Sequence, residues 1–117
     1  MRFNIYQLLA LRTKSQPRSA GDFDMDPDFL IDTMRISAGI SGKAGEIQET
    51  FKKYVRGDFG KEELRKRIKV EVGDVLWYLA VLLDAFDLPM ADVAEANIKK
   101  LSSRQERGVI RGDGDTR

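Results

Sequence analysis

The sequence contains no cysteine and no histidine. The absence of cysteine excludes disulfides, thiolate nucleophiles and zinc–thiolate sites, and it is compatible with a reducing cytoplasm. The absence of histidine excludes imidazole bases and Ser-His-Asp triads, and it removes the usual ligands of zinc and copper. Any chemistry in this chain must therefore come from carboxylates, amines and bound metal ions.

The chain also lacks a long hydrophobic run and an excess of charge. The longest apolar stretch, residues 75–83, is far shorter than the roughly 20 residues of a membrane-spanning helix. Asn4 and Gln7 interrupt the apolar start, and no small-residue cleavage site follows, so we expect no signal peptide. Twenty basic residues balance 19 acidic ones, which gives no general attraction to nucleic acid or membrane. We expect a cytoplasmic protein that binds neither.

Apolar residues recur at helical spacing, and we find no convincing strand alternation and no internal repeat. Asp26 is a plausible N-cap and Pro27 a plausible first residue of a long helix. The pattern predicts an all-α fold, a four-helix or similar bundle. The predicted helices cover about residues 3–14, 28–54, 61–86 and 89–106.

A length of 117 residues suits one domain. We place the domain at residues 1–107, with a core at about 28–107. The remaining residues, 108–117, are rich in glycine and charge, so they form a flexible tail unless they dock on another surface. This tail could fold over a site, where its acids and arginine would meet metal and phosphate.

Three glycines at intervals of three lie inside the first long helix, at Gly39, Gly42 and Gly45. Each interior glycine costs about 1 kcal/mol of helix propensity relative to alanine. They therefore indicate either close packing or a local break.

The most informative feature is a pair of acidic couples, Glu46-x-x-Glu49 on one predicted helix and Glu71-x-x-Asp74 on the next. Residues three apart share a helical face, so each couple presents two carboxylates side by side. Antiparallel packing of the two helices can bring all four together. Hard oxygen ligands of this kind suit magnesium or manganese.

Two other interpretations of these acids are solvation at the surface and pairing with lysines. Apolar residues surround Glu71 and Asp74 on most sides, which predicts at least partial burial. Clustered, buried carboxylates are costly, and a metal or another cation compensates that cost. The lysines that could form structural ion pairs instead are Lys52, Lys53 and Lys69.

A second group, Asn97, Lys100 and Arg104, is aligned on one face of the last predicted helix and suits a phosphate-bearing ligand. Such residues more often cover a solvated face. Tyr78 and Trp77 follow Asp74 closely and could stack on a ligand base, although helical aromatics usually belong to the core.

Three segments, GISGKAGEIQETFKK, EVGDVLWYLA and ANIKKLSSR, occur in an order and spacing that resemble the MazG-like nucleoside triphosphate pyrophosphohydrolases of the all-α NTP-pyrophosphatase superfamily. The resemblance covers about residues 36–107. The family often has an additional acid where this chain has Lys43. That departure weakens an auxiliary metal or charge contact, whereas the ExxE and ExxD core is intact.

The resemblance implies an enzyme that hydrolyses a nucleoside triphosphate to the monophosphate and pyrophosphate, by attack of water at the α-phosphorus. It implies magnesium, with manganese as a substitute, and a homodimer or homotetramer. The implied metal ligands are Glu46, Glu49, Glu71 and Asp74. The residues implied to face the nucleotide are Asn97, Lys100, Lys53 and Tyr78, with Lys100 and Arg104 stabilising phosphate charge.

Two alternatives stay open. One is a non-catalytic nucleotide-binding module, which Lys43 in place of an acid favours; the other is a structural oligomerisation domain in which the acids pair with lysines. Base selectivity would depend on a few groups from the loop at residues 21–26 and from a neighbouring chain.

Overall fold

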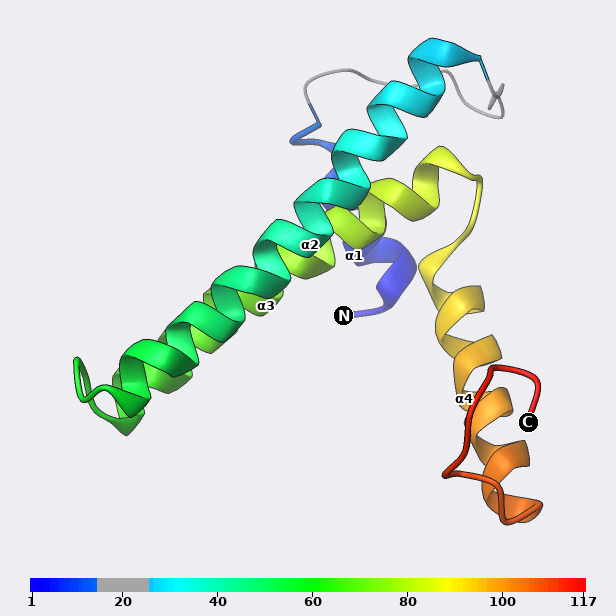
Figure 1. Ribbon diagram of the computed structural model, residues 1–117. Coiled ribbons are helices and arrows are strands. Elements are labelled where there is room, and N and C mark those ends of the chain that lie inside the picture. Colours follow the sequence, from blue (N-terminus) through cyan, green and yellow to red (C-terminus); the bar gives the residue numbers. More distant parts are fainter. Residues whose placement is uncertain (15–25) are drawn as a thin grey trace.

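The computed structural model describes residues 1–14 and 26–117 and contains four helices in these ranges, with no strand among the residues described. The all-α prediction is therefore confirmed. The helices are α1 (Phe3–Leu11), α2 (Pro27–Val55), α3 (Lys61–Ala85) and α4 (Met90–Glu106), as Figure 1 shows. All four agree with the predicted segments to within a few residues.

Helix α2 begins where its capping residues predict. The Asp26 carboxylate accepts a hydrogen bond of 2.8 Å from the Phe29 backbone N–H, and Pro27 occupies the first helical turn. Proline is tolerated there because its missing N–H would have no partner inside the helix. After Val55 the chain turns through Gly57 in the left-handed region, at φ 92°. This turn reverses the chain so that α3 runs back along α2.

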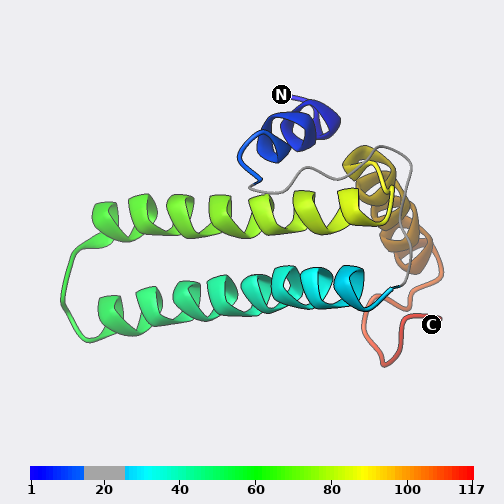
Figure 2. The same cartoon turned by 90° about the horizontal axis from the view of Figure 1, so that it is seen from above.

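Helices α2 and α3 form a long antiparallel pair, which is the main packing unit of the chain (Figure 2). Glycine permits close contact at one point of this pair. A Cβ atom at Gly39 would lie 2.2 Å from Cε1 of the Tyr78 ring, whereas one at Gly42 or Gly45 would meet nothing within 4 Å. Helix α2 continues unbroken through all three. The close-packing interpretation therefore holds for Gly39 and explains neither of the other two.

We expect Gly39→Ala and Gly42→Ala to change stability in opposite directions. The first places a methyl group inside the Tyr78 ring and should lower the free energy of unfolding by about 1–3 kcal/mol. The second adds helix propensity in open space and should raise it by about 0.5–1 kcal/mol. Urea unfolding of both variants at one protein concentration measures the difference. Equal effects of the two substitutions would contradict the packing seen at Gly39.

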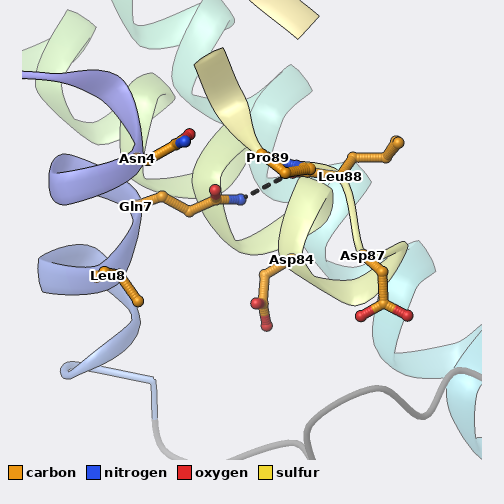
Figure 3. A pocket seen from close by; sticks show the side chains of 7 residues that line it. All are labelled: Asn4, Gln7, Leu8, Asp84, Asp87, Leu88 and Pro89. Carbon is orange, nitrogen blue, oxygen red and sulfur yellow. Dashed lines mark hydrogen bonds between the residues drawn. The ribbon is translucent and has the colours of Figure 1, made fainter. Parts of the chain in front are cut away.

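Helix α1 ties the end of α3 to the start of α4. The Gln7 amide donates to the backbone oxygens of Ala80 (3.2 Å) and Leu88 (3.1 Å), and its oxygen accepts from the Met90 N–H (3.1 Å). Figure 3 shows this side chain reaching the α3–α4 connection. Asn4 accepts from the Ala91 N–H at 3.0 Å. Two side chains of α1 thus satisfy backbone donors at the start of α4, which has no side-chain cap of its own.

Helix α4 leaves the α2–α3 pair and packs on α1 (Figure 1). The radius of gyration of the Cα atoms is 17.3 Å, against about 13 Å for a compact domain of this length. Large apolar side chains remain exposed, including Phe51 (47%), Val70 (62%) and Ile98 (62%). One chain therefore does not close into a compact four-helix bundle by itself. None of the helices that the structure describes combines the length and the apolar character needed to cross a membrane.

Candidate active site

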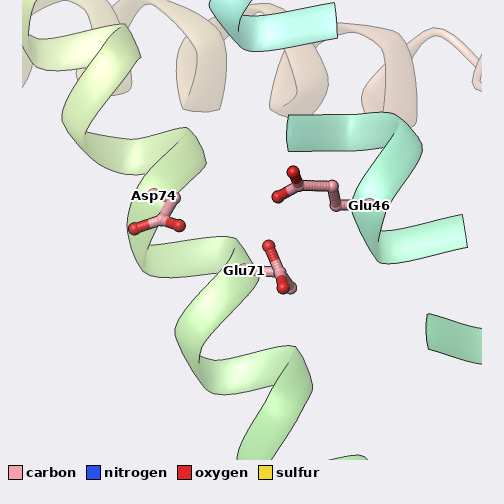
Figure 4. Close-up of side chains that lie close together, drawn as sticks. All are labelled: Glu46, Glu71 and Asp74. Carbon is pink, nitrogen blue, oxygen red and sulfur yellow. The ribbon is translucent and has the colours of Figure 1, made fainter. Parts of the chain in front are cut away.

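Three carboxylates meet between α2 and α3. Glu46 of α2, and Glu71 and Asp74 of α3, each offer one oxygen, and these oxygens all lie within 4.8 Å of one another. Figure 4 shows Glu46 and Glu71 facing each other from the two helices, with Asp74 one turn along α3. Glu71 and Asp74 are half-buried, as their apolar surroundings predict, and Glu46 is exposed. We call these three residues the carboxylate cluster.

Glu49 lies outside the carboxylate cluster. Its carboxylate pairs with Lys52 on the same helix at 3.3 Å. Glu49 lies three residues beyond Glu46 on α2, and it is therefore about one helical turn nearer the α2–α3 connection. The structure thus brings together three of the four predicted metal ligands, and a metal role for Glu49 stays a prediction.

Lys43 contacts the carboxylate cluster and adds a fourth charged group to the site. Its ammonium donates to Glu46 at 2.7 Å and lies 3.2 Å from the Asp74 carboxylate, so it bridges the two helices. Hydrogen bonds to Glu46 and then to Asp74 raise the pKa of Lys43 well above its ordinary value. The side chain therefore remains an ammonium at neutral pH.

The two glutamates of the cluster have pKa values displaced in opposite directions. Burial raises the pKa of Glu71, and its hydrogen bond with Glu46 acts in the same direction. The Lys43 hydrogen bond is the main cause of the lowered pKa of Glu46. The buried Glu71 Oε2 has no hydrogen-bond donor among the described residues. An ionised Glu46 cannot supply one, because an ionised carboxylate only accepts hydrogen bonds. A shared proton or a further cation would satisfy this oxygen.

These donors fit a divalent metal ion. Carboxylate oxygens are the ligands that magnesium and manganese prefer, and opposite ligands of magnesium are about 4.2 Å apart. Oxygens within 4.8 Å of one another need only small side-chain movements to share one ion. An ion would also supply the positive charge that the buried oxygen of Glu71 lacks.

The two aromatic residues predicted near the site line the same pocket but make different contacts. The Trp77 indole N–H donates to Ala10 O (3.1 Å) and Thr13 Oγ1 (2.7 Å), so Trp77 anchors α1, as the core interpretation predicts. Tyr78, one turn beyond Asp74, lines a pocket of about 330 Å³ together with Asp32 and Arg35. A ligand role for Tyr78 stays a prediction. The loop expected to influence base selectivity lies outside the described residues, apart from Asp26.

The predicted phosphate-binding group is on α4, which points away from the α2–α3 pair that carries the carboxylate cluster (Figure 1). Asn97 is exposed, Lys100 is half-buried, and Arg104 is buried beneath the end of the chain. Asp115 pairs with Lys100 at 3.0 Å and with Arg104 at 2.8 Å. The tail thus docks on α4, and its carboxylate contacts the two cations expected to bind phosphate.

Lys53 is seven residues beyond Glu46 on α2, about 10 Å along the helix axis toward the α2–α3 connection. The structure does not bring it to the cluster.

Two neighbours of the cluster were not among the predicted site residues. Tyr6 of α1 lies near enough to Asp74 for that carboxylate to contribute, after burial, to a raised pKa of Tyr6. The sequence marks Lys43 only as a departure from the family pattern, although it precedes Glu46 by three residues and so shares its helical face.

The fold and site define a class: helical proteins with a carboxylate cluster between paired antiparallel helices, suited to a divalent ion. The comparisons with known proteins identify the family. The family model "MazG nucleotide pyrophosphohydrolase domain" matches residues 34–109, and the chain belongs to this family. The resemblance found in the sequence is thereby confirmed.

The chain is also similar to the "Gene 37 protein" of Mycobacterium phage L5, with 40% identity over 119 residues that cover the whole of both chains. That name carries no activity. No solved structure matches this chain.

Proposed function

We propose that this protein is a magnesium-dependent nucleoside triphosphate pyrophosphohydrolase, which converts a ribo- or deoxynucleoside triphosphate into the monophosphate and pyrophosphate. The observation that carries the proposal is the carboxylate cluster, with its buried, unpaired Glu71 oxygen, in a chain of the MazG family. The substrate would come from the cytoplasmic nucleotide pool.

The residues of the chain suggest how the reaction proceeds. Glu46, Glu71 and Asp74 would hold the metal, which when bound neutralises triphosphate charge and makes water easier to deprotonate. A carboxylate oxygen that does not hold the ion would orient the attacking water and accept its proton. Attack in line at the α-phosphorus then breaks the bond to the β-phosphate oxygen and releases pyrophosphate.

The pocket beside Tyr78 is a suitable place for the nucleoside. Tyr78 is one helical turn from Asp74, so a base held there would place its phosphates toward the carboxylate cluster. Asp32 and Arg35 line the same pocket and offer an acceptor and donors to the edge of a base. The tyrosine ring supplies a stacking surface.

A second copy of the chain would complete the site and the fold. The exposed apolar side chains of α2, α3 and α4 support a homodimer or homotetramer. In such an assembly α4 of one chain could bring Asn97, Lys100 and Arg104 to the cluster of another. Phosphate contact by Lys100 and Arg104 would require Asp115 to leave them.

The second candidate function is nucleotide binding without turnover. The ion pairs of Lys43 favour it, because this ammonium already neutralises part of the cluster and could reduce the need for a metal. A purely structural role for the acids has less support, since among the described residues Lys43 is the one lysine that pairs with these three carboxylates.

The test is release of pyrophosphate and monophosphate from a panel of ribo- and deoxynucleoside triphosphates, with magnesium, with manganese and with EDTA. We expect metal-dependent release from a subset of the panel. A chain ending at Arg111, which lacks Asp115, should show a lower KM if the tail competes with substrate phosphate. No turnover of any nucleotide, with saturable nucleotide binding, would establish the second candidate instead.

A further inference from the structure

The ion pairs of Lys43 differ from an ordinary surface ion pair. The comparable pair on the same helix, Lys52 with Glu49, joins residues three apart at 3.3 Å, and the lysine side chain is 66% exposed. Lys43 makes the same local pair with Glu46 and also reaches Asp74 on the facing helix, and its side chain is 29% exposed. It is held between two carboxylates that the metal site would use.

The atoms in contact leave room for an ion beside the ammonium. Lys43 contacts one oxygen of Glu46, Oε2, and one oxygen of Asp74, Oδ2. Neither contact uses the second oxygen of these carboxylates or the buried Glu71 Oε2. The ammonium and a metal ion can therefore share the cluster without competing for the same atom.

Charge balance limits how many divalent ions can bind at the carboxylate cluster. Three ionised carboxylates carry three negative charges, and the ammonium offsets one of them, which leaves the charge that one divalent ion neutralises. With an acid at position 43 the cluster would carry four negative charges, enough for two divalent ions. Like charges close together in a partly buried site repel strongly, so this balance governs occupancy.

We propose that Lys43 is a built-in cation of the carboxylate cluster, which takes the place of a second metal ion and limits the site to one divalent ion per chain. This inference rests on the proposed metal-dependent function and refines it. Lys43 would act as a positioning residue that holds Glu46 and Asp74 at a fixed separation across the two helices.

The experiment measures Mn²⁺ bound per chain by equilibrium dialysis, with the full-length protein and no nucleotide. We expect about one ion for wild type and about two for Lys43→Glu, because the substitution adds a ligand and removes a cation. Lys43→Met should still bind about one ion, but about tenfold more tightly, since a positive charge near the ion is gone. The matched control Lys52→Met removes an ammonium from Glu49, outside the cluster, and should bind as wild type does.

Circular dichroism checks that each variant keeps its helices. Two ions bound by wild type, or one ion bound by a folded Lys43→Glu, would overturn the inference while leaving the metal site in place. If Lys43→Glu does not fold, the affinity of Lys43→Met decides, and an unchanged affinity overturns the inference. Absence of Mn²⁺ binding by wild type would overturn the proposed metal-dependent function as well, so the two failures are distinguishable.

Discussion

Glu71→Gln will slow pyrophosphate release by about 10²–10³-fold, whereas Glu49→Gln will stay within about twofold of wild type. The two substitutions are chemically identical and lie on the same pair of helices. Glu71 belongs to the carboxylate cluster and has a buried oxygen with no donor among the described residues. Glu49 pairs with Lys52 outside the cluster. Rates at saturating magnesium, on the best substrate of the panel, measure the difference.

An equal loss in both variants would show that Glu49 is the fourth ligand that the sequence predicts. A wild-type rate in Glu71→Gln would contradict the assignment of the cluster. Thermal unfolding with and without magnesium provides a second readout that does not depend on turnover: wild type should be stabilised by the ion, and Glu71→Gln much less.

The same substitution has a pH-dependent effect without metal. Because the pKa of Glu71 is raised in the folded state, the folded chain holds this proton more tightly than the unfolded chain does. The resulting stability is present below the unfolded pKa and is lost as pH rises through the folded pKa. Glutamine stays neutral throughout, so Glu71→Gln without metal should lose less stability than wild type as pH rises through this range.

Gln7→Ala will lower the free energy of unfolding by about 2–4 kcal/mol. The buried Gln7 side chain bonds to the backbone of Ala80, Leu88 and Met90, and truncation leaves buried backbone groups without these partners. The loss should loosen α4 first, because its first turn depends on α1 for hydrogen-bond acceptors. Urea unfolding at one protein concentration measures the effect.

The control for this prediction is Gln48→Ala, an exposed glutamine of α2, which should change stability by less than about 0.5 kcal/mol. Hydrogen exchange at the start of α4 should quicken in Gln7→Ala and not in the control. Stability of Gln7→Ala within 0.5 kcal/mol of wild type would show that α1 does not hold α4 in solution.

The helices and their starting points could be predicted because their causes are local. A period of 3.6 in apolar residues marks each helix, and the cap at Asp26 depends on an N–H three residues away. The pairing of Glu71 with Asp74 on one face follows from the same period. The motif segments that resemble the MazG family are likewise properties of the sequence, and the family model confirms them.

The sequence alone determined the all-α fold, the acidic faces and the family, because each depends on spacing along the chain. Only the tertiary structure decided which acids meet. The axial offset of α2 against α3 depends on packing such as that of Gly39 on Tyr78, and it places Glu46 and Lys43 at the cluster while Glu49 lies outside it. The position of α4, and the contact of Asp115 with Arg104 eleven residues away, also depend on how separate segments pack, which helical periodicity does not specify.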